Sequence, residues 1–116
     1  MDATCIANGR GYGRFARELI AAMTARSPRD EFILFVDDRA ASAWTGTSAN
    51  ARLLLVPQRV SPTIAAAADG SRSPGDMLRF TRAVWNAKVD VFFFPSVYTY
   101  FPLPPQLAAV VTLHDA

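Results

Sequence analysis

The stretch GRGYGRFARELIAAMTARSPRDEFILFV, residues 9–36, predicts a glycine-rich turn, a helix and a buried strand in succession. Three glycines within residues 9–13 predict the turn. Residues 14–26 predict the helix, because apolar side chains recur every four residues on one stripe, at Phe15, Leu19 and Met23. Ile20 and Ala22 widen this stripe. Residues 32–36 are continuously apolar, which is typical of a parallel strand that is covered on both faces.

The rest of the chain continues this alternation of strand and helix. Residues 53–56 predict a second buried strand that ends at Pro57, and residues 39–50 predict a short helix or loop around Trp44. Residues 57–75 hold prolines, glycines and an alanine run. We therefore expect a mobile loop there, with a helical turn in the alanine run.

A second long helix is expected after this loop. A serine cap, a first-turn proline and an acidic residue mark its start, at Ser73, Pro74 and Asp76. Its apolar stripe is expected at Met77, Phe80 and Val84. The helix is expected to end near Lys88.

Two more strands complete the pattern. Residues 91–94 predict a third buried strand, residues 95–108 a stiff proline-rich loop, and residues 109–113 a fourth strand. Strands that alternate with helices predict an α/β fold with an open, mostly parallel sheet flanked by helices.

Both ends of the predicted sheet look cut. The strand that normally precedes a glycine-rich turn is central in such a sheet, and only the tail end of one is visible, in residues 2–4. Three outcomes are open: residues 2–6 form a substitute strand, the sheet closes up, or a second chain covers the edge. The central gap would leave several backbone groups unpaired, so one of the three must occur. We expect self-association, because the broad apolar faces of the buried strands also lack the second domain that normally flanks their cleft.

Composition narrows the class of protein. A chain of 116 residues makes one domain at most, and 51% apolar residues with 19% charged residues exclude a fully disordered chain. The net charge of +2 gives no support to nucleic-acid binding. Cys5 is the only cysteine and His114 the only histidine, so an intrachain disulfide and a multi-histidine metal centre are excluded. We expect a cytoplasmic protein without a bound metal, and peripheral contact with a membrane stays open.

Three groups of residues are candidates for chemistry. Gly11 and Gly13 precede or open a helix, where backbone N–H groups can approach a phosphate, although the glycine spacing fits neither the dinucleotide fingerprint nor a P-loop. A tight structural turn is an equal alternative. His114, with Asp115 beside it, ends a predicted strand and could donate a hydrogen bond to a substrate or cap the sheet edge.

The third group is the aromatic loop that holds Tyr98, Tyr100 and Phe101. Aromatic faces can hold a sugar or an apolar acceptor, and packing against the core is the alternative. We therefore treat Tyr98 and Tyr100 as acceptor-side candidates.

The pieces together resemble a family. GYGRFAREL, residues 11–19, is similar to the glycine loop and first helix of group 1 (GT4-type) retaining glycosyltransferases. EFILFV, residues 31–36, resembles the second strand of that family. DVFFFPS, residues 90–96, and VVTLHD, residues 110–115, resemble the close of its first sheet. The resemblance covers nearly the whole chain in the right order, and the first and last motifs are its specific parts.

The resemblance implies a Rossmann-like domain, the N-terminal and acceptor-side half of a two-domain GT-B enzyme. Residues 1–116 would then be a partial N-terminal domain, inactive alone, and the donor-binding C-terminal domain with its paired glutamates would be absent. The parent enzyme would transfer a sugar, of hexosyl type, from a nucleoside-diphosphate-sugar to an acceptor hydroxyl with retention. No cofactor or metal is implied, since the nucleotide-sugar is a substrate.

The resemblance also assigns roles. Gly11 and Gly13 would lie near the donor diphosphate, and His114 would contact the donor sugar. Asp115 receives no firm role beyond a place on the acceptor side. The alternative from another class is a stand-alone, non-catalytic Rossmann-like or flavodoxin-like module that binds a ligand.

Overall fold

The computed structural model describes residues 1–62 and 73–114, and within them it is a mixed α/β fold. In chain order the elements are η1 (Thr4–Ala7), α1 (Gly11–Arg26), β1 (Phe32–Val36), α2 (Asp38–Ala43), β2 (Ala51–Leu55), α4 (Pro74–Ala87), β3 (Val91–Phe94), η2 (Val97–Thr99) and β4 (Ala108–Val111). The two η elements are 3-10 helices. The predicted helical turn in the alanine run falls outside the described residues.

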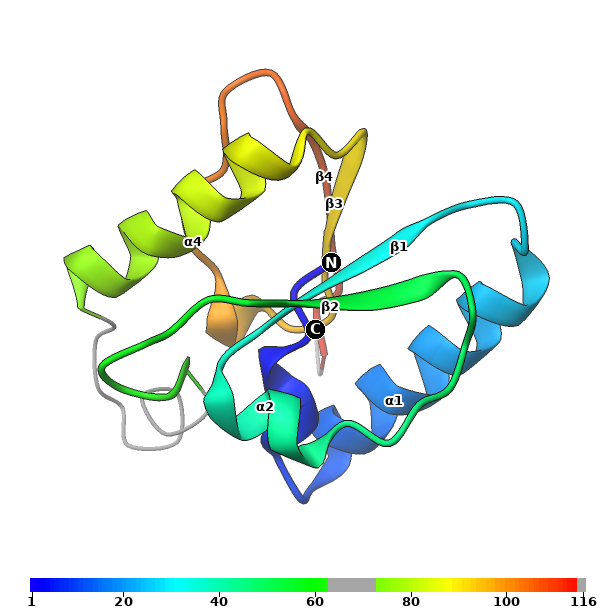
Figure 1. Ribbon diagram of the computed structural model, residues 1–116. Helices are drawn as coiled ribbons and strands as arrows, with labels where there is room; N and C mark the ends of the chain where they lie inside the picture. The colour runs from blue at the N-terminus through cyan, green and yellow to red at the C-terminus, as the bar shows by residue number, and fades with distance from the viewer. Residues whose placement is uncertain (63–72, 115–116) are drawn as a thin grey trace.

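The strands form two small parallel sheets that the first three residues join. β1 pairs with β2, and β3 pairs with β4. The N–H of Ala3 donates to the carbonyl of Phe35 at 2.9 Å, and the N–H of Phe35 donates to the carbonyl of Met1 at 3.0 Å. On the other side the N–H of Asp2 donates to the carbonyl of Phe93 at 2.9 Å. The amino terminus therefore lies between β1 and β3 (Figure 1).

The expected gap at the centre of the sheet is thus occupied. Residues 1–3 act as the substitute strand, and residues 4–7 turn away as η1. Self-association itself stays a prediction, since the structure describes a single chain.

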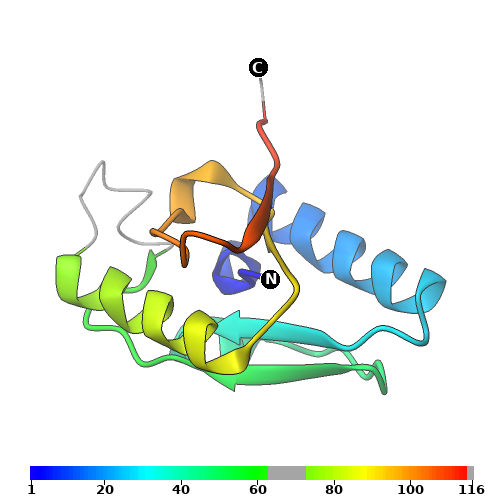
Figure 2. The ribbon, with the colours of Figure 1, turned by 90° about the horizontal axis from the view of Figure 1, so that it is seen from above.

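Two apolar clusters lie on opposite faces of the strands, with α1 on one side and α4 on the other (Figures 1 and 2). The strand β1 contributes to both, because successive side chains of a strand point to opposite faces. The cluster on the α1 side holds Met1, Ala3, Cys5, Ile6, Ala16, Ile20, Leu34, Val36 and Ala40. The cluster on the α4 side holds Phe35, Val56, Phe80, Val84, Phe92, Phe94 and Phe101.

The first helix begins earlier than predicted. Gly11 and Gly13 belong to the first turn of α1 rather than to a preceding turn, and Arg10 is the N-cap residue. The N–H groups of a first turn have no partner inside the helix, and a glycine there has no side chain to block access to them. The glycine pattern therefore marks the start of the helix itself.

The buried face of α1 agrees with the predicted stripe only at Ile20. The buried positions are Gly13, Ala16, Ile20 and Thr24. The predicted stripe of Phe15, Leu19 and Met23 is only half-buried. The small side chains Gly13 and Ala16 let the helix approach η1 closely, and the half-buried larger side chains lie at the margins of the contact.

The second long helix agrees better with its prediction. α4 begins at Pro74, ends with Lys88 in the left-handed conformation at φ 51°, and buries Phe80 and Val84 as expected. Asp76 does more than open the helix. Its carboxylate accepts hydrogen bonds from the N–H groups of Arg59 and Val60, at 3.1–3.2 Å, and thereby anchors the segment after β2.

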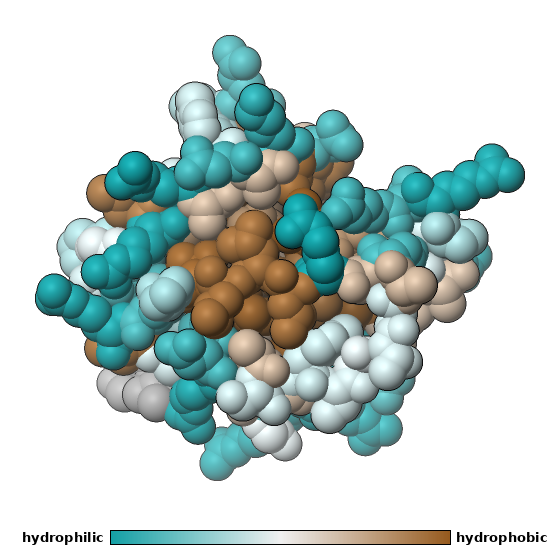
Figure 3. Space-filling view, in the orientation of Figure 1, coloured by the Kyte–Doolittle hydropathy of each residue, from teal (hydrophilic) through white to brown (hydrophobic). Residues whose placement is uncertain are grey.

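The strands β2 and β4 are less buried than their apolar sequences predict. β2 begins at Ala51, two residues before the predicted start, and Leu53 and Leu55 are exposed. Figure 3 shows an apolar patch over β2 in the middle of this face. All residues of β4 are exposed, since β4 lies at the margin of the paired strands. The expectation of strands covered on both faces holds only near the centre.

Candidate functional site at the carboxyl ends of the strands

The carboxyl ends of β3, β4 and the residue 1–3 segment face the same edge of the fold, because these strands are parallel. The 3-10 helix η1 and the start of α1 lie after the first segment, and the loop with η2 follows β3. Open α/β sheets bind their ligands at the carboxyl ends of the strands, at the point where the strand order reverses. This edge is therefore where the predicted site residues are expected to lie.

His114 lies at this edge and contacts the first helix. Its Nε2 is 2.8 Å from the carbonyl oxygen of Pro95. A carbonyl oxygen only accepts, so Nε2 carries a proton and donates in this contact. The ring stands edge-on to Tyr12, with centroids 5.0 Å apart, and to Phe15, with centroids 4.8 Å apart. The imidazole is thus held half-buried in a fixed orientation.

The aromatic loop divides between two surroundings. Tyr98 stands edge-on to Tyr12 at a centroid distance of 5.5 Å and therefore joins the group around His114. Tyr100 instead packs against Phe94, at 5.2 Å, on the α4 side. Tyr98 is 58% exposed, which leaves its ring accessible to a ligand. The structure thus brings Tyr98 to the candidate site and places Tyr100 against another partner.

The two candidate glycines differ in what surrounds them. A Cβ on Gly13 would overlap the carbonyl oxygen of Asn8 and come within 2.9 Å of its carbon and 3.0 Å of the carbonyl oxygen of Cys5. A Cβ on Gly11 would meet no atom within 4 Å. Gly13 therefore permits the close approach of α1 to the preceding loop, and Gly11 lies where the backbone faces open space.

A buried polar network anchors the floor of the site. The carboxylate of Asp2 accepts from the N–H of Thr4 at 2.9 Å and from its hydroxyl at 2.7 Å. The hydroxyl of Thr99, in η2, donates to the other carboxylate oxygen. All three residues are buried. The network ties the loop after β3 to the central segment and so fixes where Tyr98 lies.

Neither this network nor the partners of His114 were predicted from the sequence. An aspartate followed two residues later by a threonine is a recognised local turn pattern and could have been found. The contacts of Tyr12 and Phe15 with His114 join opposite ends of the chain, and no local sequence pattern predicts them.

Cys5 is buried just below the site. Burial, with the Asp2 carboxylate nearby, raises the pKa of its thiol from 9.0 to about 12. The thiol therefore stays protonated at neutral pH and is a poor nucleophile, since the thiolate is the reactive form. We assign Cys5 to the core.

We predict that a thiol reagent at pH 8 labels Cys5 at least about tenfold more slowly in the folded chain than in urea. Both the high pKa and the burial of the thiol oppose the reaction. With an aromatic disulfide as the reagent, the labelling rate can be followed by the absorbance of the thiolate that the reagent releases. Equal rates in buffer and in urea would mean that Cys5 is not packed as described.

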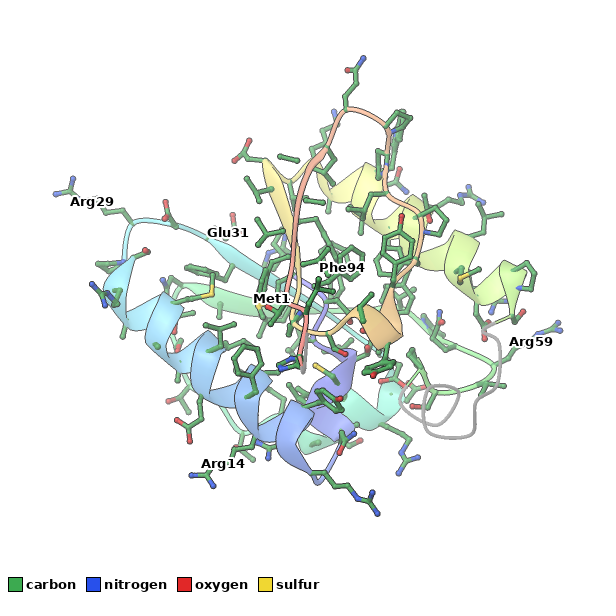
Figure 4. All side chains as sticks on the ribbon, turned by 180° about the vertical axis from the view of Figure 1, so that it is seen from behind. Met1, Arg14, Arg29, Glu31, Arg59 and Phe94 are labelled. Atoms are coloured by element: carbon green, nitrogen blue, oxygen red, sulfur yellow. The ribbon has the colours of Figure 1, made fainter. Side chains whose placement is uncertain are left out.

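Arg14, near the start of α1, is exposed, and its side chain extends away from the molecule (Figure 4). Asp115 lies outside the described residues. Within residues 1–62 and 73–114 no three histidine, cysteine or acidic side chains gather into a metal-binding group. No helix in these ranges has the length and apolar character that a membrane span requires.

Comparisons of the chain with protein-family models, with curated proteins and with solved structures found no match.

Proposed function

We propose that this chain is the acceptor-side, Rossmann-like domain of a retaining glycosyltransferase of the GT-B type. The parent enzyme would act in the cytoplasm and transfer a hexosyl group from a nucleoside-diphosphate-sugar to an acceptor hydroxyl. The donor would bind between this edge of the strands and a second domain.

One observation carries the proposal. The two motifs that most resemble the family come from opposite ends of the chain, yet their residues are in contact, with the rings of Tyr12 and His114 5.0 Å apart. The contact lies at the carboxyl ends of parallel strands, which is where open α/β folds bind ligands. A helix that begins with glycine and lies beside a histidine could bind a phosphorylated sugar, with the helix start at the phosphate and the histidine at the sugar.

The residues divide the work as follows. The N–H groups at the start of α1, around Gly11, would face the diphosphate, because a helix start carries partial positive charge. His114 would form a hydrogen bond with the sugar through Nδ1, since Nε2 donates to the carbonyl of Pro95, and the contacts with Pro95 and Tyr12 set the orientation of the ring. Tyr98 would offer an aromatic face on the acceptor side. Stabilisation of the leaving diphosphate would supply most of the rate enhancement, with basic groups of the second domain.

Gly13 has a different role from Gly11 in this proposal. Its lack of a side chain lets α1 start beside Asn8, so Gly13 positions the phosphate-facing turn. It need not touch a ligand. Asp115 receives no role.

The test is sugar transfer by a protein that joins this chain to a donor-binding domain. We expect His114→Ala to lower turnover at least tenfold, which corresponds to about 1.4 kcal/mol of lost transition-state stabilisation. The chain of 116 residues by itself is expected to transfer no sugar.

Leu113→Ala is the matched control, since Leu113 is the exposed neighbour of His114 and should leave turnover unchanged. Circular dichroism would establish that both variants fold. Wild-type turnover in a folded His114→Ala protein would reduce His114 to a cap on the sheet edge. That result would favour the alternative, a non-catalytic ligand-binding module.

A further inference from the structure

We propose that the cavity between the end of α4 and the turn before β4 binds a free α-amino acid with an apolar side chain. Asp90, just before β3, and Leu107, just before β4, both line this cavity. It therefore lies at the amino ends of these strands, on the opposite edge from the candidate site. The proposal does not depend on glycosyl transfer.

The size of the cavity suits a small molecule. Its volume is about 640 Å³, within the range of about 300–1,000 Å³ that is usual for small-molecule sites. One wall is the end of α4, with Val84, Trp85 and Lys88, and the other wall is the turn of residues 104–107. The end of α4 and the loop before β4 both lie at the top of Figure 1.

Hydrogen bonds of the protein itself hold the two walls in place. The N–H of Leu107 donates to the carbonyl of Pro104 at 3.1 Å and closes the turn. Pro105 takes the second position of that turn, where its ring fixes φ. The hydroxyl of Thr81, on α4, donates to the carbonyl of Pro102 at 2.5 Å and ties this loop to the helix. A ligand would therefore not have to order the walls of its site.

The apolar part of the lining would hold a hydrocarbon side chain. Val84 belongs to the core cluster on the α4 side, and Val89 and Leu107 pack against that cluster, so this part of the lining is continuous with the core. Trp85 also lines the cavity and is 63% exposed, and its indole offers a flat apolar face. A ligand that covered the indole would remove apolar surface from water.

Two charges of opposite sign select the polar end of the ligand. Lys88 and Asp90 both line the cavity, and among the described residues neither takes part in an ion pair. Lys88 would attract a simple carboxylate and Asp90 would repel it, and a simple amine would meet the reverse conflict. An α-amino acid carries an ammonium and a carboxylate on one carbon, so it meets both charges at once. The side-chain amide of Gln106 can donate to the carboxylate or accept from the ammonium.

The backbone at Lys88 allows its charge to be removed without harm to the fold. Lys88 ends α4 in the left-handed conformation, at φ 51° and ψ 47°, where glycine is the usual residue because it has no Cβ. We expect Lys88→Gly to melt at the temperature of the wild type or up to about 5 °C higher. Weaker binding by this variant would then come from the missing ammonium.

Three probes that differ only in charge test the proposal on the full chain. They are L-phenylalanine, 3-phenylpropanoate, which lacks the ammonium, and 2-phenylethylamine, which lacks the carboxylate. Binding is followed through the amide resonances of Gln106 and Leu107 in the isotope-labelled chain. For a ligand of this size we expect phenylalanine to bind with a dissociation constant on the order of 1 mM. Each of the other two probes is expected to bind at least about threefold more weakly.

Variants of the two walls give the second readout. Lys88→Gly and Trp85→Ala are each expected to weaken the binding of phenylalanine at least about threefold. Arg82→Gln and Leu78→Ala are the matched controls, because both residues are exposed on the same helix and lie outside the lining of the cavity. Both controls should leave the dissociation constant unchanged.

Unchanged resonances up to about 20 mM phenylalanine would overturn the proposal. Equal affinities for the three probes, with no effect of Lys88→Gly, would overturn it too, because the cavity would then take up apolar molecules whatever their charge. Tighter binding of 3-phenylpropanoate or of 2-phenylethylamine than of phenylalanine would assign the cavity to a ligand with a single charge. The claim of an amino-acid site would then be wrong.

Discussion

Gly13→Ala is expected to destabilise the folded chain by about 3 kcal/mol or more. The new Cβ would overlap the carbonyl oxygen of Asn8 and come within 3.0 Å of the carbonyl oxygen of Cys5. Both obstacles are backbone atoms, which cannot rotate away as a side chain can. The loss is a large part of a typical stability of about 5–15 kcal/mol. Urea unfolding followed by circular dichroism measures it.

Gly11→Ala is the matched control on the same helical turn. Its Cβ would meet open space, and alanine favours a helix over glycine by up to about 1 kcal/mol. We therefore expect unchanged or slightly higher stability. Equal losses of stability for the two variants would show that α1 does not approach the preceding loop as described. The two glycines would then have the same structural role.

Asp2→Ala is expected to cost about 3 kcal/mol of folding stability. The variant removes the acceptor for the N–H and hydroxyl of Thr4 and for the hydroxyl of Thr99. Each buried polar group left unsatisfied costs about 1–3 kcal/mol. The same urea titration measures the loss, and hydrogen exchange of the loop after β3 is expected to quicken.

Asp2→Asn separates the hydrogen bonds from the charge. The amide keeps an oxygen for the N–H of Thr4, and the hydroxyl of Thr99 can rotate to accept from the amide nitrogen. A loss of about 1 kcal/mol is therefore expected. A stability of Asp2→Ala within error of the wild type would contradict the described network.

The elements that depend on local pattern were predictable from the sequence. β1 and β3 have the predicted bounds, because a short run of β-branched and aromatic residues between polar or proline boundaries has few alternatives as a buried strand. α4 follows the predicted start at Pro74, since proline is well placed in the first turn of a helix.

The features that depend on contacts between distant parts of the chain could not be predicted from the sequence. The buried face of α1 is set by how close Gly13 and Ala16 let the helix come, which the apolar stripe alone does not reveal. The exposure of β4 follows from its place at the margin of the strands, whereas its sequence is as apolar as that of a central strand. The use of residues 1–3 as a substitute strand was one of three outcomes that local pattern left open.

The candidate site shows the same division. His114 was predictable as a residue at the end of a strand. Its contacts with Tyr12 and Phe15 required the fold. Tyr98 and Tyr100 are two residues apart, yet the 3-10 helix η2 sends them to different neighbours.

The central claim is that the start of α1 and His114 together form one side of a nucleotide-sugar site. Titration of the isotope-labelled chain with uridine and guanosine diphosphate sugars, followed by nuclear magnetic resonance, tests it most directly. We predict shifts at the amides of Gly11 and Tyr12 and at the ring of His114, with a dissociation constant of about 1 mM or weaker. Free sugars without the diphosphate should leave the Gly11 amide unshifted. Unchanged resonances at Gly11 and His114 up to about 10 mM ligand, the range of very weak binding, would contradict the claim.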